Sequence, residues 1–253
     1  MKCLILAAGY ATRLYPLTEN FPKPLLDVQG KTILDWLVED IASCGIREFL
    51  VVTNHRFAGH FEAWAAARPE AIRVIDDGTS TNETRLGAVR DIALAAREEE
   101  DYLVIAGDNL LDFSFGGFIH FFQEHKAPCV MTHEEKDPDK QRKTAIITFE
   151  ADGRITSYEE KPLQPKGNHA VPPFYCYRAQ DIRRIPEALA EGCGYDAPGS
   201  FAAWLSSRTP VYAYEMPGKR YDIGDMESYR KVQEEALFAI SDAPPAARSI
   251  YTS

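Results

Sequence analysis

Short, unbroken apolar runs alternate with amphipathic stretches through the first half of the chain. The apolar runs predict buried strands at residues 2–7, 49–53, 72–75 and 102–106. Between them, apolar residues recur with helical spacing and predict helices at residues 32–44, 57–67 and 86–97. Buried strands separated by helices are typical of a mostly parallel sheet covered on both faces. We therefore expect a doubly wound α/β domain that binds ligands beyond the carboxyl ends of its strands.

The pattern changes after residue 127, where short β-like segments follow one another. The predicted strands lie at residues 130–132, 145–149, 155–158 and 174–177, with a hairpin turn at 151–154. Helices are expected at residues 179–191, 199–207 and 225–240, and a further strand at 211–215. No internal repeat or strong linker interrupts the chain. We therefore expect a single domain over residues 1–240, with a smaller β-rich lobe, and a loose tail over residues 241–253.

Composition and charge exclude several classes of function. Lys and Arg number 28 against 38 Asp and Glu, so the formal net charge is −10. Such a chain is a poor general binder of nucleic acid, which needs clustered cations, but a few local cations still hold a small anion. The five cysteines form no CxxC pair and predict neither a disulfide framework nor a zinc site. Without a membrane-spanning run or a signal-peptide layout, we expect a cytoplasmic protein and leave a homo-oligomer open.

The segment after the first strand carries the most informative chemistry. Residues 6–28 form a turn of small residues followed by two cations, Arg13 and Lys23, each beside prolines that stiffen the backbone. Exposed backbone N–H groups in such a turn cradle phosphates, and the cations suit the charge that builds up during phosphoryl transfer. The segment matches neither the P-loop nor the dinucleotide-binding fingerprint. Taken alone, an Arg and a Lys in a loop are more often a solvated surface pair.

Three other segments carry acids or a lysine that are candidates for chemistry. Asp108 follows the fourth strand, where a carboxylate faces the ligand and is able to hold Mg²⁺, although a turn or helix cap is the commoner role. Asp222 stands just before the last helix, and Asp225 beside it is expected to cap that helix. Glu160 and Lys161 belong to a run of charges that by itself predicts only a solvated surface.

Together these segments closely resemble a known family. Leu6–Thr18 and Pro22-Lys23-Pro24 are similar to the signature L-A-A-G-x-G-T-R-L-x-P-L-T and P-K-P of the sugar-1-phosphate nucleotidyltransferases, such as glucose-1-phosphate thymidylyltransferase and mannose-1-phosphate guanylyltransferase. The elements G-D-N, E-K-P and N-x-A-V and the segment Tyr221-Asp222-Ile223-Gly224-Asp225 follow in the family's order, so the resemblance spans about residues 2–235. Ala11 and Pro173 stand where the family usually has glycine. The resemblance implies this family's α/β fold without an appended module.

The resemblance also implies the reaction and the residues that perform it. A sugar 1-phosphate attacks the α-phosphorus of a nucleoside triphosphate, with Mg²⁺ as the cofactor, and pyrophosphate leaves. The implied catalytic residues are Arg13, Lys23, Asp108 and Lys161, and the implied metal ligands are Asp108 and Asp222. The implied nucleotide-binding residues are Leu6, Ala8, Gly9, Tyr10, Ala11, Thr12, Asn82, Gly87 and Asp108. The implied residues of the sugar site are Asn109, Glu160, Lys161, Val171 and Tyr175.

The base and the acceptor stay open at this stage. Residues 77–89, where family members bind the base, match neither the thymidine-type G-L-A-Q-A nor the guanosine-type G-T-A-G-A, and Arg85 either reaches phosphate or starts a helix. An alternative is a cytidylyltransferase-like enzyme that acts on phosphocholine or a phosphonate. A non-catalytic regulatory subunit is disfavoured because Arg13, Lys23 and the aspartates are all present. A glycosyltransferase is disfavoured because Asp108-Asn109-Leu110, which follows the fourth strand, is not a D-x-D motif.

Overall fold

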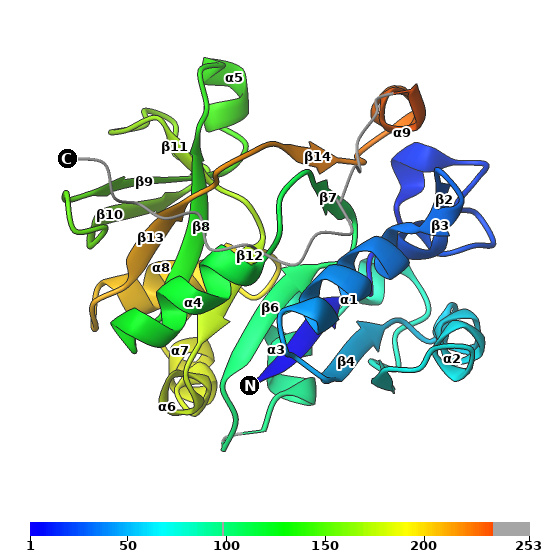
Figure 1. Ribbon diagram of the computed structural model, residues 1–253. Coiled ribbons are helices and arrows are strands. Elements are labelled where there is room, and N and C mark those ends of the chain that lie inside the picture. Colours follow the sequence, from blue (N-terminus) through cyan, green and yellow to red (C-terminus); the bar gives the residue numbers. More distant parts are fainter. Residues whose placement is uncertain (98, 235–253) are drawn as a thin grey trace, which may run out of the picture.

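One large sheet runs through the molecule (Figure 1), and the computed structural model describes residues 1–97 and 99–234 of the chain. Its strand order is β10-β9-β11-β8-β12-β6-β1-β4-β5, with β13 also paired to β8. The parallel half consists of β1 (Lys2–Leu6), β4 (Glu48–Thr53), β5 (Ala71–Asp76) and β6 (Tyr102–Ala106). The carboxyl ends of these strands therefore meet at one edge of the sheet.

The other half of the sheet is mostly antiparallel and forms the predicted β-rich lobe. Its strands are β8 (Cys129–Glu134), β9 (Ala145–Phe149), β10 (Ile155–Glu160), β11 (His169–Val171), β12 (Phe174–Tyr177) and β13 (Tyr212–Glu215). β12 joins the two halves because it pairs with β6 on one side and β8 on the other. The lobe thus continues the main sheet.

Helices cover both faces of the parallel half. Alternate side chains of β1 show this, because Cys3 and Ile5 pack into one core cluster and Leu4 packs into the other. The first cluster includes side chains of α1 (Ile33–Ser43), α2 (Ala58–Ala66), α4 (Gly116–His125) and α9 (Met226–Glu234). The second includes side chains of α3 (Ala88–Ala95), α6 (Ala179–Ile182), α7 (Ile185–Ala190) and α8 (Gly199–Ser206). The predicted doubly wound α/β class is confirmed.

Short elements complete the chain. Three 3-10 turns lie at Thr12–Leu14 (η1), Lys23–Leu25 (η2) and Asn82–Thr84 (η3), and α5 spans Pro138–Gln141. Two small sheets pair β2 (Asp27–Val28) with β3 (Lys31–Thr32), and β7 (Asn109–Leu111) with β14 (Arg220–Asp222). No helix of the described residues is both long and apolar enough to cross a membrane. The predicted tail at residues 241–253 lies outside the described residues, and so does the end of the helix expected at 225–240.

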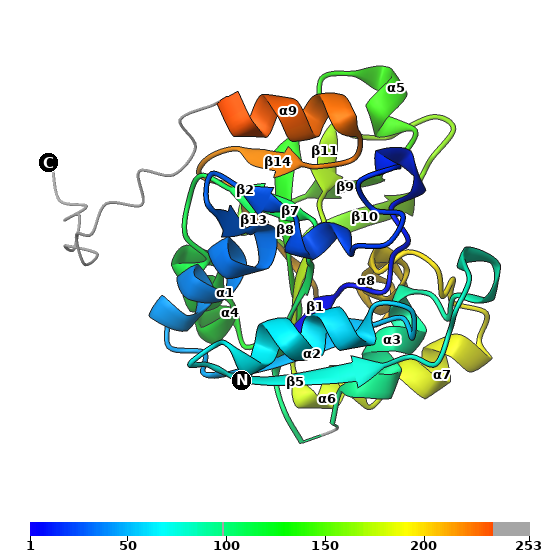
Figure 2. The ribbon, with the colours of Figure 1, turned by 90° about the vertical axis from the view of Figure 1, so that its right-hand side faces the viewer.

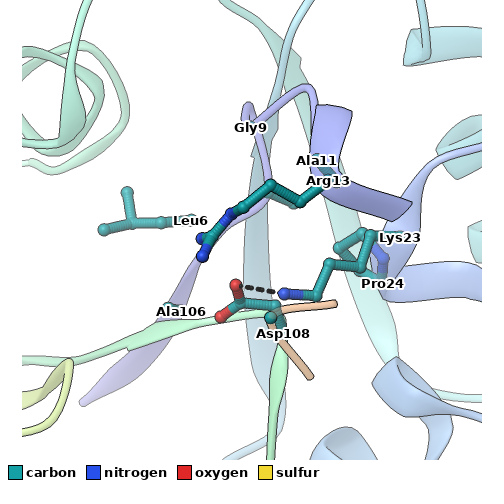
Figure 3. A pocket seen from close by; sticks show the side chains of 10 residues that line it. Leu6, Gly9, Ala11, Arg13, Lys23, Pro24, Ala106 and Asp108 are labelled. Carbon is teal, nitrogen blue, oxygen red and sulfur yellow. Dashed lines mark hydrogen bonds and ion pairs between the residues drawn. The ribbon is translucent and has the colours of Figure 1, made fainter. Parts of the chain in front are cut away.

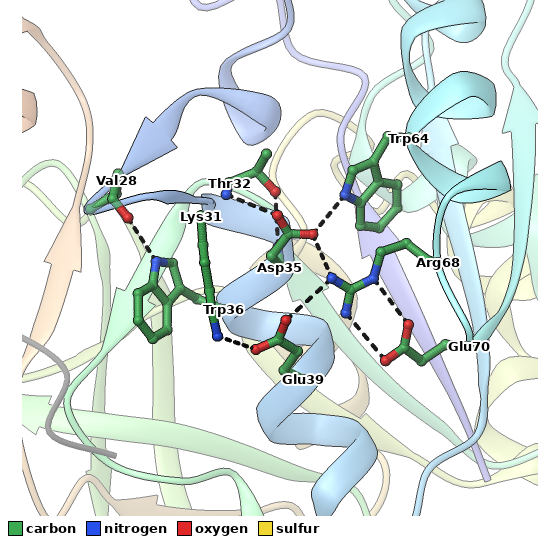
Figure 4. Close-up of polar contacts among 9 residues, drawn as sticks. All are labelled: Val28, Lys31, Thr32, Asp35, Trp36, Glu39, Trp64, Arg68 and Glu70. Carbon is green, nitrogen blue, oxygen red and sulfur yellow. Dashed lines mark hydrogen bonds and ion pairs between the residues drawn. The ribbon is translucent and has the colours of Figure 1, made fainter. Parts of the chain in front are cut away.

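A polar network fastens α1 to its neighbours (Figure 4). Thr32 and Asp35 form a capping box at the start of α1, and the Asp35 carboxylate also accepts hydrogen bonds from Trp64 and Arg68. Arg68 in turn pairs with Glu70. Burial disfavours the charged Asp35 carboxylate, but the hydrogen bonds from Trp64 and Thr32 outweigh it and lower the pKa of Asp35. The network therefore links the start of α1 to Trp64 of α2 and to Arg68 and Glu70, which follow α2.

Candidate active site

Hydrogen bonds from three other residues fix the backbone of the turn after β1. The Leu6 carbonyl accepts from Gly107 N–H at 3.0 Å, and the Ala8 carbonyl accepts from the Asn54 amide at 3.0 Å. Ala11 has a left-handed backbone, with φ of 46°, and its carbonyl accepts from the Thr18 hydroxyl at 2.8 Å. This is the position where the family usually has glycine, so alanine pays the strain of a conformation that glycine adopts freely.

A pocket opens beside this turn (Figure 3). Its wall comes from four separate segments of the chain: the turn after β1, the η2 region, the end of β6 and the region after β14. The lining residues are Leu6, Ala7, Gly9, Ala11, Arg13, Lys23, Pro24, Ala106, Asp108 and Gly224. The structure therefore gathers six of the residues expected to bind nucleotide or to act in catalysis, namely Leu6, Gly9, Ala11, Arg13, Lys23 and Asp108.

The two cations of the pocket lie in different electrostatic settings. Lys23 is 7% exposed, and its ammonium donates to Asp108 Oδ2 at 2.8 Å. Arg13 is exposed, points into the pocket, and forms no ion pair with a described residue. Hydrogen bonds from Ser228 lower the pKa of Asp225, and the charge of Arg13 adds to this effect. The positive charge of Arg13 is therefore available to bind an anion, whereas the charge of Lys23 is balanced by Asp108.

The second acid, Asp222, lies on β14, which pairs with β7, the strand directly after Asp108. Asp222 stands opposite Asn109 in the β7–β14 ladder, and the Ile223 N–H approaches the Asp108 carbonyl at 3.4 Å. Asn109 is 2% exposed; its amide donates to Asp108 Oδ1 at 2.6 Å, and its carbonyl oxygen accepts from Arg220 at 2.6 Å. Arg220 also lies 3.5 Å from Asp222 Oδ2. One hydrogen-bonded chain therefore connects the two acids.

The acids fit a magnesium ion that takes its remaining ligands from substrate. Their carboxylate oxygens are hard donors, and the side chains of Asp108 and Asp222 are 38% and 52% exposed, so both are accessible. Mg²⁺ commonly binds one or two carboxylates together with phosphate oxygens and water. No group of three or more acidic, histidine or cysteine side chains within residues 1–97 and 99–234 is arranged for a metal.

The last helix is anchored onto the hairpin that follows the phosphate-binding segment. The Tyr229 hydroxyl donates to the Asp27 carbonyl at 2.7 Å, and the Gln233 amide donates to the same oxygen at 2.6 Å. Asp225 accepts from the Ser228 N–H at 2.8 Å, so it caps α9 as the sequence predicts. Residues 222–225 are therefore held against the pocket by contacts on both sides.

Four of the residues expected to bind the sugar lie in or next to the β-rich lobe, whereas Asn109 lies on β7. Val171 and Tyr175 are buried, at 4% and 2% exposure, on β11 and β12. Burial raises the pKa of Glu160, and the charge of Lys161 opposes this rise. Lys161 itself is exposed and has a left-handed backbone, with φ of 48°. Gly199 was not singled out from the sequence, yet a Cβ at this position would lie 2.9 Å from Glu160 Oε2 and 3.2 Å from the Tyr175 hydroxyl.

The segment expected to bind the base lies outside the residues that line the pocket. Asn82 is exposed in η3, and Gly87 has a φ of 91° and packs under Tyr195. Three polar atoms in this region have no hydrogen-bond partner among the described residues, namely the Tyr10 hydroxyl, Asp77 Oδ2 and Asp91 Oδ1. Burial raises the pKa of Asp91 to about 7, with the charge of Asp77 adding to the rise.

Cations around an open backbone turn, next to two acids, suit the transfer of a nucleotidyl group, in which charge grows on phosphate oxygens. Such a site at the carboxyl edge of a doubly wound sheet defines a nucleotidyltransferase. The chain belongs to the Nucleotidyl transferase family, whose sequence model matches residues 2–237. The membership expected from the sequence motifs is therefore confirmed.

Known relatives agree with this membership. A UTP–glucose-1-phosphate uridylyltransferase of Haloferax volcanii is 25% identical over 249 residues, which cover 94% of this chain and 99% of the relative. A glucose-1-phosphate thymidylyltransferase of an Actinoplanes species is 32% identical over 193 residues, or 72% of this chain and 59% of the longer relative. The expected enzyme class, a sugar-1-phosphate nucleotidyltransferase, is confirmed by these relatives.

A solved structure supports the fold. A putative glucose-1-phosphate thymidylyltransferase from Bacillus anthracis, in complex with a sucrose, superposes with a TM-score of 0.80 at 23% identity. The match covers 92% of this chain and 94% of the other. At this level of identity the likeness concerns the arrangement of strands and helices.

Proposed function

We propose that the protein transfers a nucleotidyl group from a nucleoside triphosphate to a sugar 1-phosphate, forming a nucleotide-sugar and releasing pyrophosphate. The observation that carries this proposal is the pocket that brings Arg13, Lys23 and Asp108 together beyond β1 and β6. The pocket offers two cations and a carboxylate to a triphosphate, and Asp222 adds a second carboxylate from β14. The reaction matches the one named for the two relatives.

Each group of the pocket has a role in this reaction. The backbone N–H groups of residues 8–12 hold the triphosphate, and Arg13 stabilises the charge on the departing pyrophosphate. A phosphate oxygen of the acceptor bonds to the α-phosphorus while the bond to the β-phosphate oxygen breaks. Lys23 bridges the reacting phosphates, and Lys161 holds the acceptor phosphate. No general base is needed, because the acceptor phosphate is already ionised.

Magnesium is the proposed cofactor. Asp108 and Asp222 would hold the ion, which would supply positive charge against the α-phosphate oxygens. The sugar site would be formed by Glu160, Val171, Tyr175 and Asn109. We also propose a cytoplasmic protein that acts without nucleic acid or a membrane, and we leave assembly into a homo-oligomer to measurement of the mass in solution.

A substrate panel tests the proposal. The four ribonucleoside triphosphates and dTTP are each combined with hexose 1-phosphates, phosphocholine and a small phosphonate, and pyrophosphate release is measured with and without Mg²⁺. We expect release that requires both a sugar 1-phosphate and the metal. Release with phosphocholine or the phosphonate alone would support the cytidylyltransferase-like alternative. Absence of acceptor-dependent release in every combination would refute nucleotidyl transfer.

A further inference from the structure

The loop between α7 and α8, residues 191–198, joins the segment expected to bind the base to the β-rich lobe. Figure 2 shows α3 beside α7, and α7 also contacts α8. The Ala88 N–H donates to the Asp196 carbonyl at 3.2 Å, and the Val89 N–H donates to the Tyr195 carbonyl at 2.9 Å. The first turn of a helix leaves such amides without partners. The start of α3 is therefore completed by a loop more than a hundred residues away in the sequence.

Side chains strengthen this junction. Arg85 donates to both carboxylate oxygens of Asp196, at 2.8 and 3.2 Å, and the Arg90 guanidinium lies 3.8 Å from the Tyr195 ring centre. Gly87 allows the close approach, because a Cβ there would lie only 2.6 Å from the Tyr195 carbonyl oxygen. Arg85, whose role the sequence left open, therefore has Asp196 as its ion-pair partner.

The same loop contacts the acceptor side through the residue that follows it. At Gly199, the first residue of α8, a Cβ would lie 2.9 Å from Glu160 Oε2 and 3.0 Å from the Tyr158 hydroxyl. Arg85 lowers the pKa of Asp196, and the positive charge of Lys161 adds to this effect. Only two residues, Ala197 and Pro198, thus separate the contact of Asp196 with the base segment from the contact of Gly199 with Glu160.

We propose that Arg85 and Asp196 are positioning residues for the acceptor. This inference rests on the proposed function. The ion pair fixes the α7–α8 loop, and the fixed loop holds Gly199 in place against the side chains of Glu160 and Tyr158. The side chains of Arg85 and Asp196 are 43% and 56% exposed, and ion pairs at such exposure add little to global stability. Removing the pair should therefore loosen the acceptor pocket while the fold persists.

Steady-state kinetics of Arg85→Gln and Asp196→Asn test the inference, with the KM of triphosphate and the KM of acceptor measured separately. We expect the acceptor KM to rise about five- to tenfold, in the range of a modest coupling between sites, and kcat and the triphosphate KM to change less than about twofold. Arg184→Gln is the matched control, because Arg184 forms a similar two-bond pair with Glu187 on α7 at 31% and 46% exposure. The control should leave all three parameters unchanged.

Two outcomes would overturn the inference. An equal rise in the triphosphate KM would show that Arg85 contacts the nucleotide, and unchanged parameters in both variants would show that the pair is a plain surface contact. The charge exchange Arg85→Asp with Asp196→Arg should restore the acceptor KM to within about threefold of the natural value, because the pair is re-formed in reverse. A purely local loss of packing at either position would not be rescued in this way.

Amide hydrogen exchange separates this inference from the proposed function. In Arg85→Gln, we expect faster exchange at residues 156–161 and 199–205, with the rest of the sheet unchanged, whether or not the protein turns over the tested substrates. Arg184→Gln should not change exchange at residues 156–161. If the natural protein releases no pyrophosphate, the function fails, yet faster exchange in Arg85→Gln alone still supports the linkage. Equal exchange in the variant and the natural protein contradicts it.

Discussion

The ion pair between Lys23 and Asp108 yields the sharpest prediction. Lys23→Met keeps the length of the side chain but removes its charge from a position that is only 7% exposed. At the observed 2.8 Å, Coulomb's law gives about 6 kcal/mol at an effective dielectric constant of about 20, and about 1.5 kcal/mol at about 80. The Asp108 side chain is 38% exposed, and desolvation of Lys23 offsets part of the attraction. We therefore expect a coupling of about 1–2 kcal/mol.

Catalysis should suffer more than stability. Loss of one cation that stabilises the reacting phosphates removes about 2–4 kcal/mol of transition-state stabilisation, or about 30- to 1,000-fold in turnover. Urea unfolding gives the stability, and pyrophosphate release gives the turnover. The double variant Lys23→Met with Asp108→Asn should lose less unfolding free energy than the two single variants together, and the difference is the coupling energy. The double variant should regain no activity.

A nearby pair supplies the control for this experiment. Lys31 binds Glu39 at 2.6 Å with side chains 43% and 39% exposed, so Lys31→Met should cost less than about 1 kcal/mol and leave turnover unchanged. If Lys23→Met kept its turnover within about threefold of the natural protein, Lys23 would not act on the phosphates and the proposed role would be wrong.

Three further predictions concern single side chains. Arg13→Met should raise the activation free energy of the reaction by about 2–4 kcal/mol and so lower turnover. The midpoint of urea unfolding should stay unchanged, because Arg13 pairs with no described residue. An equal loss of folding stability would contradict this prediction. Ala11→Gly should raise the free energy of unfolding by about 1 kcal/mol in urea titration, because it relieves a φ of 46°; a destabilised variant would show that the strain is absent. The pKa of Asp91 is raised to about 7, so the contribution of Asp91 to stability is greatest below its pKa in the unfolded state and falls as pH rises toward 7. Asp91→Asn should therefore be more stable than the natural protein by about 2–4 kcal/mol at about pH 8 and should gain no stability at about pH 4. A gain of equal size at both pH values would refute the burial argument.

Local patterns predicted the parallel half of the fold well. The alternation of β1 side chains between two cores follows from strand geometry, and the helix expected at residues 32–44 forms as Ile33–Ser43. The helix expected at residues 179–191 is instead divided into α6 and α7, with Pro186 in the first turn of α7. No helix was predicted where α4 forms, at Gly116–His125.

The site was only partly predictable for a physical reason. The motifs gave Lys23 and Asp108, but the 2.8 Å contact between their side chains depends on how distant segments fold together. Arg220 and Gly199 carried no local signal, since their importance arises from the β7–β14 ladder and from the packing of α8 on Glu160. Arg85 was ambiguous for the same reason: its partner Asp196 lies 111 positions away.

The β7–β14 ladder also sets the order in which the protein becomes competent during synthesis. The phosphate-binding turn, Lys23 and Asp108 are all made within the first 108 residues, but their second acid lies on β14 and is secured by α9, which is made more than a hundred residues later. In the proposed reaction, the residues that hold the triphosphate are therefore made before the residues that complete the proposed metal site.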